Sequence, residues 1–313
     1  MKNYIITNAN AKKPILNTNI INTNDKNILK PKWQALNGNE IILSNQQIEI
    51  AKLGEKLFFD TRLSTDGKIA CVSCHSLNGG GTDNRPTSLG VFKQTGTRSA
   101  PSVYNASLQS LLFWDGRAKS LKQQAAGPLM NPVEMGNHDF ASILKTITNS
   151  DDYKREFPQY FSSHRYINSD DVLDAITTYE QTLIDKDTPY DRYILGDLSS
   201  LSPSQIRGMK RFDEIGCKNC HDGPNFSRAS KLSLYQGKDG MRIFPVFTSD
   251  LSRKYNLEKD KGANPNGKYG QFRIPSLRNI ALTYPYFHNG AVNKLEDAIG
   301  IMAVSQLGMT YNN

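Results

Sequence analysis

Two five-residue stretches, Cys71-Val72-Ser73-Cys74-His75 and Cys217-Lys218-Asn219-Cys220-His221, decide the fold of this chain. In each stretch two thiols lie three positions apart, and a histidine directly follows the second thiol. This arrangement lets the two sulfurs add to the two vinyl groups of one haem while the imidazole coordinates the iron. Each stretch therefore predicts one covalently bound haem c, so the chain is expected to carry two.

A redox-active or zinc-binding Cys-x-x-Cys pair is the main alternative for each stretch. Neither of those sites needs a histidine directly after the second cysteine, and here that histidine occurs twice. All four cysteines of the chain, Cys71, Cys74, Cys217 and Cys220, belong to the two motifs, so none is left for a structural disulfide. His75 and His221 are then the predicted proximal ligands of the two irons.

An amphipathic helix is predicted before each motif. The first begins after the capping residue Ser44, and the second after Ser202, with Pro203 as its first helical residue. Apolar residues recur at helical spacing in both, namely Ile50, Leu53 and Leu57 in the first and Ile206, Met209 and Phe212 in the second. A third capped helix is predicted from Ser169. The recurrence of helix and motif indicates two copies of one structural unit.

The 313 residues are enough for two domains of ordinary size. Residues 1–40, rich in Asn, Thr and Lys, predict an extended arm, residues 41–195 a first haem domain, and residues 196–313 a second. No segment shows convincing strand alternation. The predicted fold is mainly α, with two cytochrome c-like domains that each hold one covalent haem.

Composition and charge exclude several classes of protein. An apolar content of 38% and a charged content of 22% are typical of a globular protein, and no apolar stretch is long enough to span a membrane. The net charge of +8 is scattered, which disfavours nucleic-acid binding and is compatible with an acidic redox partner or an anionic surface. Covalent haem attachment indicates the periplasm, although Met1 to Lys13 contain no signal-like apolar segment.

Few other side chains can serve as iron ligands or as acid and base. His138, His164 and His288 remain, with seven methionines, and His138 and His164 are expected to be ordinary surface or core residues. Met302 lies on one predicted helical face with Leu295, Ala298 and Ile299, which periodicity alone assigns to the core. Glu134 lies among apolar and proline residues, where a raised pKa would suit proton transfer, although a solvated loop glutamate is the alternative.

Taken together, these segments closely resemble the bacterial diheme cytochrome c peroxidases from about Leu53 onward. The most specific stretches are Cys71–Gly90, Gly96–Ala106, Phe113–Met135, Phe272–Asn279 and Tyr284–Gly308. The resemblance implies that the N-terminal haem reduces hydrogen peroxide to water, and that electrons enter at the C-terminal haem from a small cytochrome c or cupredoxin. It also implies a homodimer.

The resemblance assigns roles to particular residues. Glu134 matches the family's acid/base, with Gln124 beside it, and Trp114 matches the tryptophan placed between the haems. Met302 matches the distal methionine ligand of the second iron, which reverses the preference for a core role. Related diheme oxidases, which act on a partner protein, carry tyrosine at that position.

Three departures from the family pattern matter. Many members have a histidine that blocks the peroxidatic iron until the other haem is reduced, and the matching residue here is Val91, which cannot ligate. Family members also hold a calcium ion between their domains, and the matching positions are Ser99, Thr283 and Pro285; serine is a poorer ligand than the family's asparagine. The chain ends at Asn313, where relatives continue into a final helix, so a truncated or unusual C-terminus is expected.

Two other functions compete with the peroxidase. One is a diheme oxidase acting on a protein or an organic substrate, and the other is a diheme electron-transfer cytochrome without enzymatic activity. Met302 disfavours the oxidase. Val91 together with Glu134 disfavours the electron carrier, which would normally fill both axial positions on both irons.

Overall fold

The computed structural model describes residues 33–161, 166–235 and 240–309. Within these ranges the fold is mainly helical, which confirms that part of the prediction. The α-helices are α1 (Asn45–Phe58), α2 (Cys71–Cys74), α3 (Leu121–Met130), α4 (Phe140–Asn149), α5 (Asp151–Tyr160), α6 (Ser169–Thr182), α7 (Pro189–Ile194), α8 (Pro203–Glu214), α9 (Asp250–Lys254) and α10 (Leu295–Leu307). The strands are β1 (Met241–Phe244) and β2 (Gly270–Arg273). Short 3-10 turns span Thr61–Leu63, Val91–Lys93, Ala106–Leu108, Cys217–Asn219 and Ile280–Leu282.

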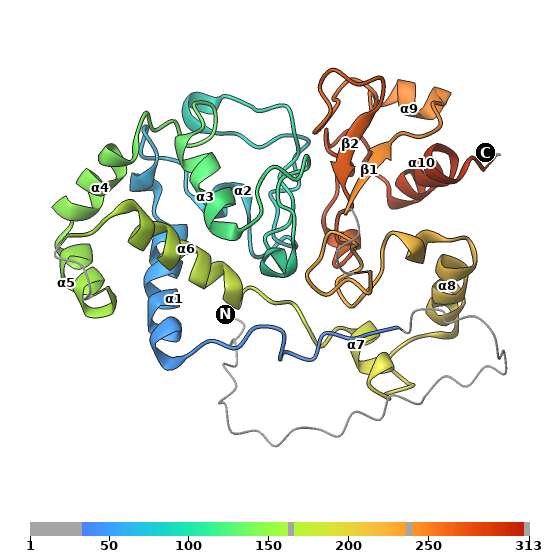
Figure 1. Cartoon of the computed structure of the whole chain (residues 1–313), viewed down its shortest axis with the longest axis horizontal. Coiled ribbons are helices and arrows are strands. Elements are labelled where there is room, and N and C mark those ends of the chain that lie inside the picture. The colour runs from blue at the N-terminus through green and yellow to red at the C-terminus, as the bar shows by residue number, and fades with distance from the viewer. Residues whose placement is uncertain (1–32, 162–165, 236–239, 310–313) are drawn as a thin grey trace.

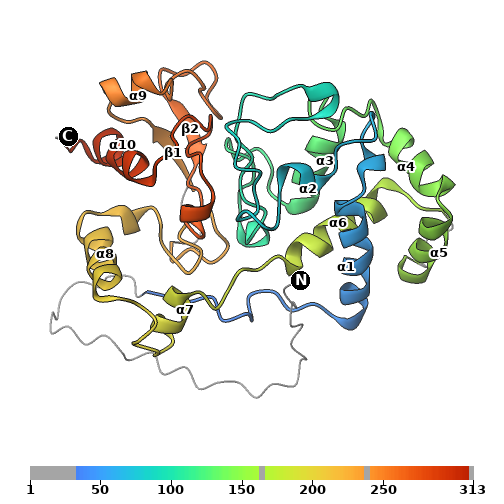
Figure 2. The ribbon, with the colours of Figure 1, turned by 180° about the vertical axis from the view of Figure 1, so that it is seen from behind.

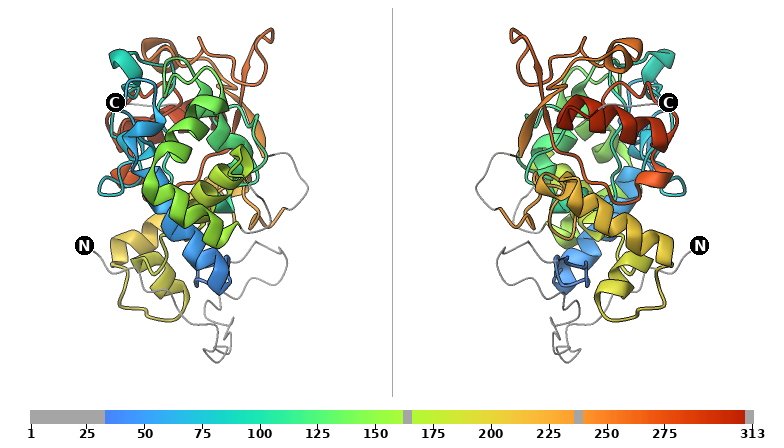
Figure 3. Two further views of the ribbon diagram at one scale, coloured as in Figure 1. Left: turned by 90° about the vertical axis from the view of Figure 1, so that its left-hand side faces the viewer. Right: turned by 90° about the vertical axis from the view of Figure 1, so that its right-hand side faces the viewer.

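The elements gather into two lobes (Figure 1). The first lobe contains α1 to α6, and the second contains α8 to α10 with the two strands. Helix α7 lies below the junction, and the same separation is visible from behind (Figure 2). Figure 3 shows α10 and α8 at the outer end of the second lobe. One haem motif belongs to each lobe.

The crossing of α1 and α6 organises the first lobe. Helix α1 begins after Ser44, whose side chain accepts a hydrogen bond from the Gln47 amide in a capping box, so the predicted start of this helix is confirmed. Helix α6 is buried along most of its length. The two helices approach most closely at Gly54, where a Cβ atom would lie 1.9 Å from the carbonyl oxygen of Ala175. Only glycine allows this crossing, which places α1 directly before the first haem motif.

Gly54→Ala is expected to lower the free energy of unfolding by about 1–3 kcal/mol, because the new methyl group meets backbone rather than a movable side chain. Gly208→Ala is the matched control, since Gly208 also lies in a helix and its Cβ would meet nothing within 4 Å. That control should be neutral or slightly stabilising. Urea denaturation of both variants measures the difference, and equal midpoints would contradict the tight crossing.

The second lobe contains a small sheet that the sequence analysis did not predict. Strands β1 and β2 pair antiparallel, with Met241 opposite Arg273 and Phe244 opposite Gly270. The expectation of no strands was therefore wrong. Each strand has only four residues, and the burial of β1 does not alternate, so period-2 patterning could not reveal it.

The helices of the second lobe agree only partly with the predicted faces. Helix α8 begins after Ser202 with Pro203 as its first residue, as expected. In α10 the predicted face is wrong in one position, because Ile299 is 57% exposed whereas Ile301 is fully buried. Met302 is partly buried and packs against the second-lobe core.

Residues 33–43 precede α1 and form no helix or strand, and residues 1–32 of the predicted arm lie outside the described ranges. Residues 33–43 pass alongside α7, between α1 and the second lobe (Figure 1). The Leu36 amide donates to the Asp191 carboxylate over 2.8 Å, and Leu36 itself is buried. Arg278, which lies in the second lobe, donates to both oxygens of the Asp191 carboxylate over 2.7 and 2.8 Å. One buried carboxylate therefore joins the arm, α7 and the second lobe.

None of the helices within the described ranges is both long enough and apolar enough to cross a bilayer.

Candidate haem and peroxide sites

The first motif forms the short helix α2, with His75 directly after it. Both thiols remain free of disulfides. Burial raises the pKa of Cys71 to about 12 and that of Cys74 to about 11. This apolar setting suits uncharged sulfur, as in a thioether to haem, and opposes the thiolate that zinc binding requires.

The imidazole of His75 is oriented by its backbone neighbours. Its Nδ1 atom lies 3.4 Å from the carbonyl oxygen of Gly81, which leaves Nε2 to face an iron. Gly81 has a φ of +83°, and a Cβ there would lie 2.7 Å from the Ser102 hydroxyl, so this residue must be glycine. Burial lowers the pKa of His75, which favours the neutral ring that a metal needs.

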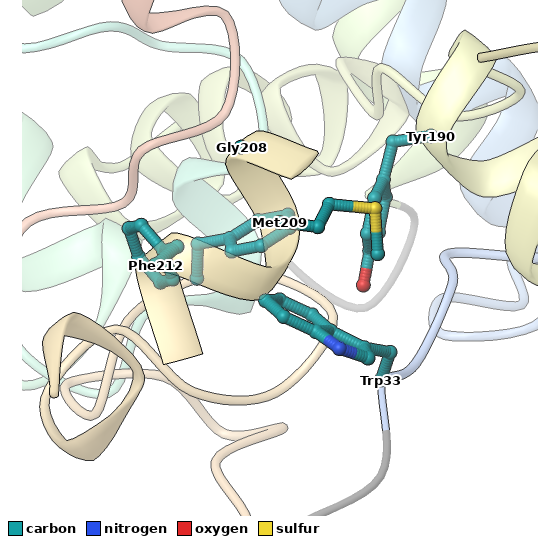
Figure 4. A pocket seen from close by; sticks show the side chains of 6 residues that line it. Trp33, Tyr190, Gly208, Met209 and Phe212 are labelled. Atoms are coloured by element: carbon teal, nitrogen blue, oxygen red, sulfur yellow. The ribbon is translucent and has the colours of Figure 1, made fainter. Parts of the chain in front are cut away.

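The second motif repeats this arrangement with different partners. The Nδ1 atom of His221 lies 3.1 Å from the carbonyl oxygen of Phe226, and burial again lowers the imidazole pKa. The Phe212 ring lies 6.4 Å from the His221 ring, and Phe212 and Trp33 line an apolar hollow on α8 (Figure 4). Within the motif, the Lys218 ammonium lies 3.9 Å from the centre of the Trp33 ring. The donor set of both motifs fits a haem c.

A zinc site lacks support in the described part of the chain. No three His, Cys, Asp or Glu side chains converge there in a way that could hold a metal ion. His138, one of the spare histidines, has a fully exposed ring, which is the ordinary surface position expected for it. His164 lies outside the described residues.

Glu134 lies in a tight turn that folds back on the end of α3. Its carboxylate accepts a hydrogen bond of 2.7 Å from the Asn131 side chain. Burial raises the pKa of Glu134, and the positive charge of Arg117 and the Asn131 hydrogen bond offset part of that effect. The negative charge of Glu134 also raises the pKa of Cys74, so the carboxyl lies within electrostatic reach of the first motif. A carboxyl in this setting can both accept and release a proton.

The loop that carries Val91 packs against the Glu134 turn. The Val91 amide donates to the Glu134 carbonyl oxygen over 2.8 Å, and the Val91 side chain is fully buried. At Gly90 a Cβ atom would lie 1.9 Å from the Val133 carbonyl oxygen, which makes glycine necessary. The Asp66 carboxylate accepts from the Phe92 amide at the tip of the loop. The loop therefore supports the turn that holds the candidate acid/base.

Two further predicted residues lie in helices. Gln124 is on α3, which runs directly into the Glu134 turn, although no hydrogen bond joins the two side chains. Met302 lies on α10 and packs in the same apolar cluster as Trp114. These positions are compatible with the roles that the resemblance implies.

Trp114 lies where the first-lobe chain meets the second lobe. Its indole N–H donates to the Ser99 carbonyl oxygen over 2.8 Å, and the Ser99 amide donates to the carbonyl of His288 over 2.7 Å. Beside the other two predicted calcium positions, the side-chain NH2 group of Asn84 donates to the carbonyls of Leu282 and Tyr284 over 2.8 Å each. These carbonyls flank Thr283 and precede Pro285.

The sequence analysis did not predict the burial of three polar residues, although it named His288 among the possible iron ligands. Glu180 on α6 has a carboxyl oxygen without a hydrogen-bond partner, and burial raises its pKa to about 8. His288 stacks on Phe272 at 4.3 Å and has a buried Nε2 without a partner, and burial lowers its pKa to about 4. Burial also lowers the pKa of Arg273 to about 10. Nothing in a single sequence distinguishes these residues from exposed ones.

A mainly helical fold with two haem-compatible motifs and a nearby carboxyl defines the class of c-type haem enzymes. A family model described as di-haem cytochrome c peroxidase matches residues 48–199. The cytochrome c551 peroxidase of Nitrosomonas europaea is 38% identical over 268 residues, covering 85% of this chain and 76% of that protein. The cytochrome c551 peroxidase of Pseudomonas aeruginosa is also 38% identical, covering 85% and 74%.

Among solved structures, a MauG-like protein associated with microbial copper homeostasis superimposes with a TM-score of 0.74 and 27% identity. It covers 90% of this chain and 83% of that chain. This chain belongs to the di-haem cytochrome c peroxidase family, and the predicted resemblance is confirmed. It is accordingly an enzyme of the peroxidase class, and the family implies haem c as its cofactor.

Proposed function

We propose that this protein reduces hydrogen peroxide to water at the haem of the first motif, with electrons delivered through the haem of the second. The observation that carries this proposal is Glu134, a carboxyl whose pKa is raised by burial and which lies on the side of Cys74. An electron carrier would have no use for a proton-transferring group at this place. Bound at Cys71 and Cys74 with His75 as its ligand, the haem would supply the iron and electrons for the reduction.

The protein's own contribution is to hold and move a proton. Glu134 accepts the proton from the peroxide oxygen nearer the iron and returns it to the distal oxygen, which then leaves as water. Asn131 holds one carboxylate oxygen by its 2.7 Å hydrogen bond, so the other oxygen is free to exchange the proton. Gln124, on the adjoining helix, orients the peroxide in this proposal.

The second motif is proposed as the site of electron entry. His221 and Met302 would hold its iron, and a thioether ligand would raise the reduction potential of that haem. Trp114, between the motifs, is proposed as the relay between the haems. Support comes from its contacts in the second lobe, where it packs with the cluster that contains Met302.

Several partners follow from the family rather than from geometry. We propose a small cytochrome c or cupredoxin as electron donor, the periplasm as the location, and a homodimer as the assembly. Calcium is proposed at Ser99, Thr283 and Pro285 on the resemblance alone. The carbonyls of Leu282 and Tyr284, beside Thr283 and Pro285, accept from the Asn84 side-chain NH2 group, which a bound calcium ion would have to displace if it used them. Calcium binding can be tested by titrating the metal-depleted protein with calcium.

The peroxidatic iron is proposed to be open without reductive activation. Val91 stands where many members have a blocking histidine, and its side chain is buried while its amide is bonded to the Glu134 turn. The Val91 side chain therefore cannot ligate the iron, and the Val91 amide is already hydrogen-bonded. Glu134 is already held in place in this arrangement.

Electron paramagnetic resonance of the fully oxidised protein tests this state. One high-spin haem beside one low-spin haem is expected, with peroxide turnover on the first addition and no pre-reduction. Two low-spin haems without turnover would contradict the open site, and would favour a gated enzyme or an electron carrier.

A diheme oxidase is the second candidate, because related diheme enzymes oxidise a partner protein. Met302 argues against it through the resemblance, because the related oxidases carry tyrosine at that position. Peroxide turnover with a reduced cytochrome c, compared with peroxide-driven oxidation of a protein substrate, separates the two activities.

A further inference from the structure

Arg98 joins the two lobes through a pair of carboxylates. Its Nε and Nη2 atoms donate to the two oxygens of Asp260 over 2.6 and 2.9 Å, and its Nη1 atom donates to Asp115 over 2.7 Å. Asp115 precedes α3 of the first lobe in the chain, whereas Asp260 lies between α9 and β2 of the second lobe. The three side chains are 14% to 25% exposed, so water screens the pairs only in part. The Arg98 guanidinium therefore links the first lobe to the second through these two ion pairs.

Several residues near the Arg98 ion pairs contact Trp114 through hydrogen bonds and a ring contact. Ser99, next to Arg98, accepts from the indole N–H over 2.8 Å. The Arg273 amide donates to the Trp114 carbonyl over 2.9 Å, and the Arg273 guanidinium donates to the Phe113 carbonyl over 2.8 Å. The indole ring meets His288 edge-on at 6.4 Å. Asp115, held by Arg98, follows Trp114 directly in the chain.

These contacts make the position of the indole depend on how the lobes are joined. Ser99 directly follows Arg98 and Asp115 directly follows Trp114 in the chain. A shift of the Arg98 guanidinium therefore moves both the carbonyl that accepts from the indole N–H and the residue that follows Trp114. We propose that Arg98, by bridging Asp115 and Asp260, is a positioning residue that fixes Trp114 against the second lobe for electron transfer. The inference rests on the proposed relay role of Trp114.

The first test measures the hold on the indole without any turnover. In the reduced, carbon monoxide-bound holoprotein, labelled with ¹⁵N at tryptophan, hydrogen exchange of each indole N–H is followed by NMR. Arg98→Gln and Asp260→Asn should each speed exchange at Trp114 by about tenfold, as expected for losing a charge-assisted hydrogen bond. Trp33, the only other tryptophan in the sequence, is the internal control.

Two further variants sharpen this test. Arg98→Lys keeps the charge but loses the planar fork, so it should not restore slow exchange. Arg253→Gln is the matched control, because Arg253 pairs with Asp250 within α9 on the surface of the second lobe. Asp260→Asn preserves shape and guards against a folding defect in the arginine variants. Unchanged exchange at Trp114 in both Arg98→Gln and Asp260→Asn overturns the proposal.

The second test asks whether the hold matters for electron transfer. The enzyme with only its second haem reduced is mixed rapidly with peroxide, and oxidation of that haem is followed optically. Arg98→Gln and Asp260→Asn should slow this step, with the potentials of both haems unchanged. The double variant should be no slower than either single one, since both break one contact.

Trp114→Phe separates this inference from the function on which it rests. If Trp114→Phe leaves the oxidation of the second haem as fast as before, the relay role fails, although the exchange result for Arg98 can still stand. If Trp114→Phe slows that step but Arg98→Gln and Asp260→Asn do not, the relay stands and the positioning role of Arg98 is refuted.

Discussion

Replacement of Glu134 by Gln is expected to reduce peroxide turnover by about 10²–10⁴-fold, the usual contribution of one general acid/base. Gln has the shape of Glu and keeps a carbonyl for the 2.7 Å hydrogen bond from Asn131, but it cannot carry a proton. The optical spectrum of the oxidised haems should not change. Steady-state kinetics with a reduced electron donor measure the loss.

The pH dependence gives this prediction a second readout. Glu134 must be ionised to accept the first proton, so kcat/KM should rise as the pH increases through the pKa of its carboxyl. Burial raises that pKa above the ordinary value of 4.5, and the acid limb of the profile should be displaced upward to match. In Glu134→Gln the remaining activity should lack this limb.

Glu55→Gln is the matched control for Glu134, because Glu55 lies exposed on α1. It should turn over peroxide like the unmodified protein. Full turnover in Glu134→Gln would remove this residue from the mechanism.

Replacement of Arg278 by Gln is expected to lower the free energy of unfolding by about 3–5 kcal/mol. Arg278 is 5% exposed at its side chain and Asp191 is fully buried, so the substitution leaves an uncompensated carboxylate in the interior. The guanidinium hydrogen bond to the Pro224 carbonyl is lost as well. Chemical denaturation followed by circular dichroism measures the change.

The partner and the control make this result interpretable. Combining Arg278→Gln with Asp191→Asn should recover part of the loss, because the stranded charge is then removed. Arg253→Gln breaks only an exposed pair and should cost less than about 1 kcal/mol. A small effect of Arg278→Gln, equal to that of the control, would show that the buried pair does not hold the arm and lobes together.

Local chemistry explains which parts of the fold could be predicted. The two motifs, the caps at Ser44 and Ser202 and the helical spacing after them are all encoded within a few residues, so they could be read directly from the sequence. Val91 and Glu134 were also identified from the sequence, but only as two separate residues matched to a family. Their contact became visible in the structure.

The features that escaped prediction depend on distant partners. The strands β1 and β2 pair across an intervening segment, and the burial of Ile301 instead of Ile299 depends on how α10 packs. Arg98, Glu180 and His288 look like ordinary polar residues in the sequence. The pairing of Arg98 with Asp260 spans the two lobes, and the burial of Glu180 and His288 depends on residues far away in the sequence. No local pattern could therefore reveal these features.

The carboxylate of Asp191 also bears on the order in which the protein is synthesised. Leu36 leaves the ribosome long before Arg278, which completes the cluster around that carboxylate. The residues around Leu36 therefore cannot form their final contacts until the chain between these two positions has been made. A contact of such long sequence separation slows folding, so the join between the lobes should be among the last parts to become stable.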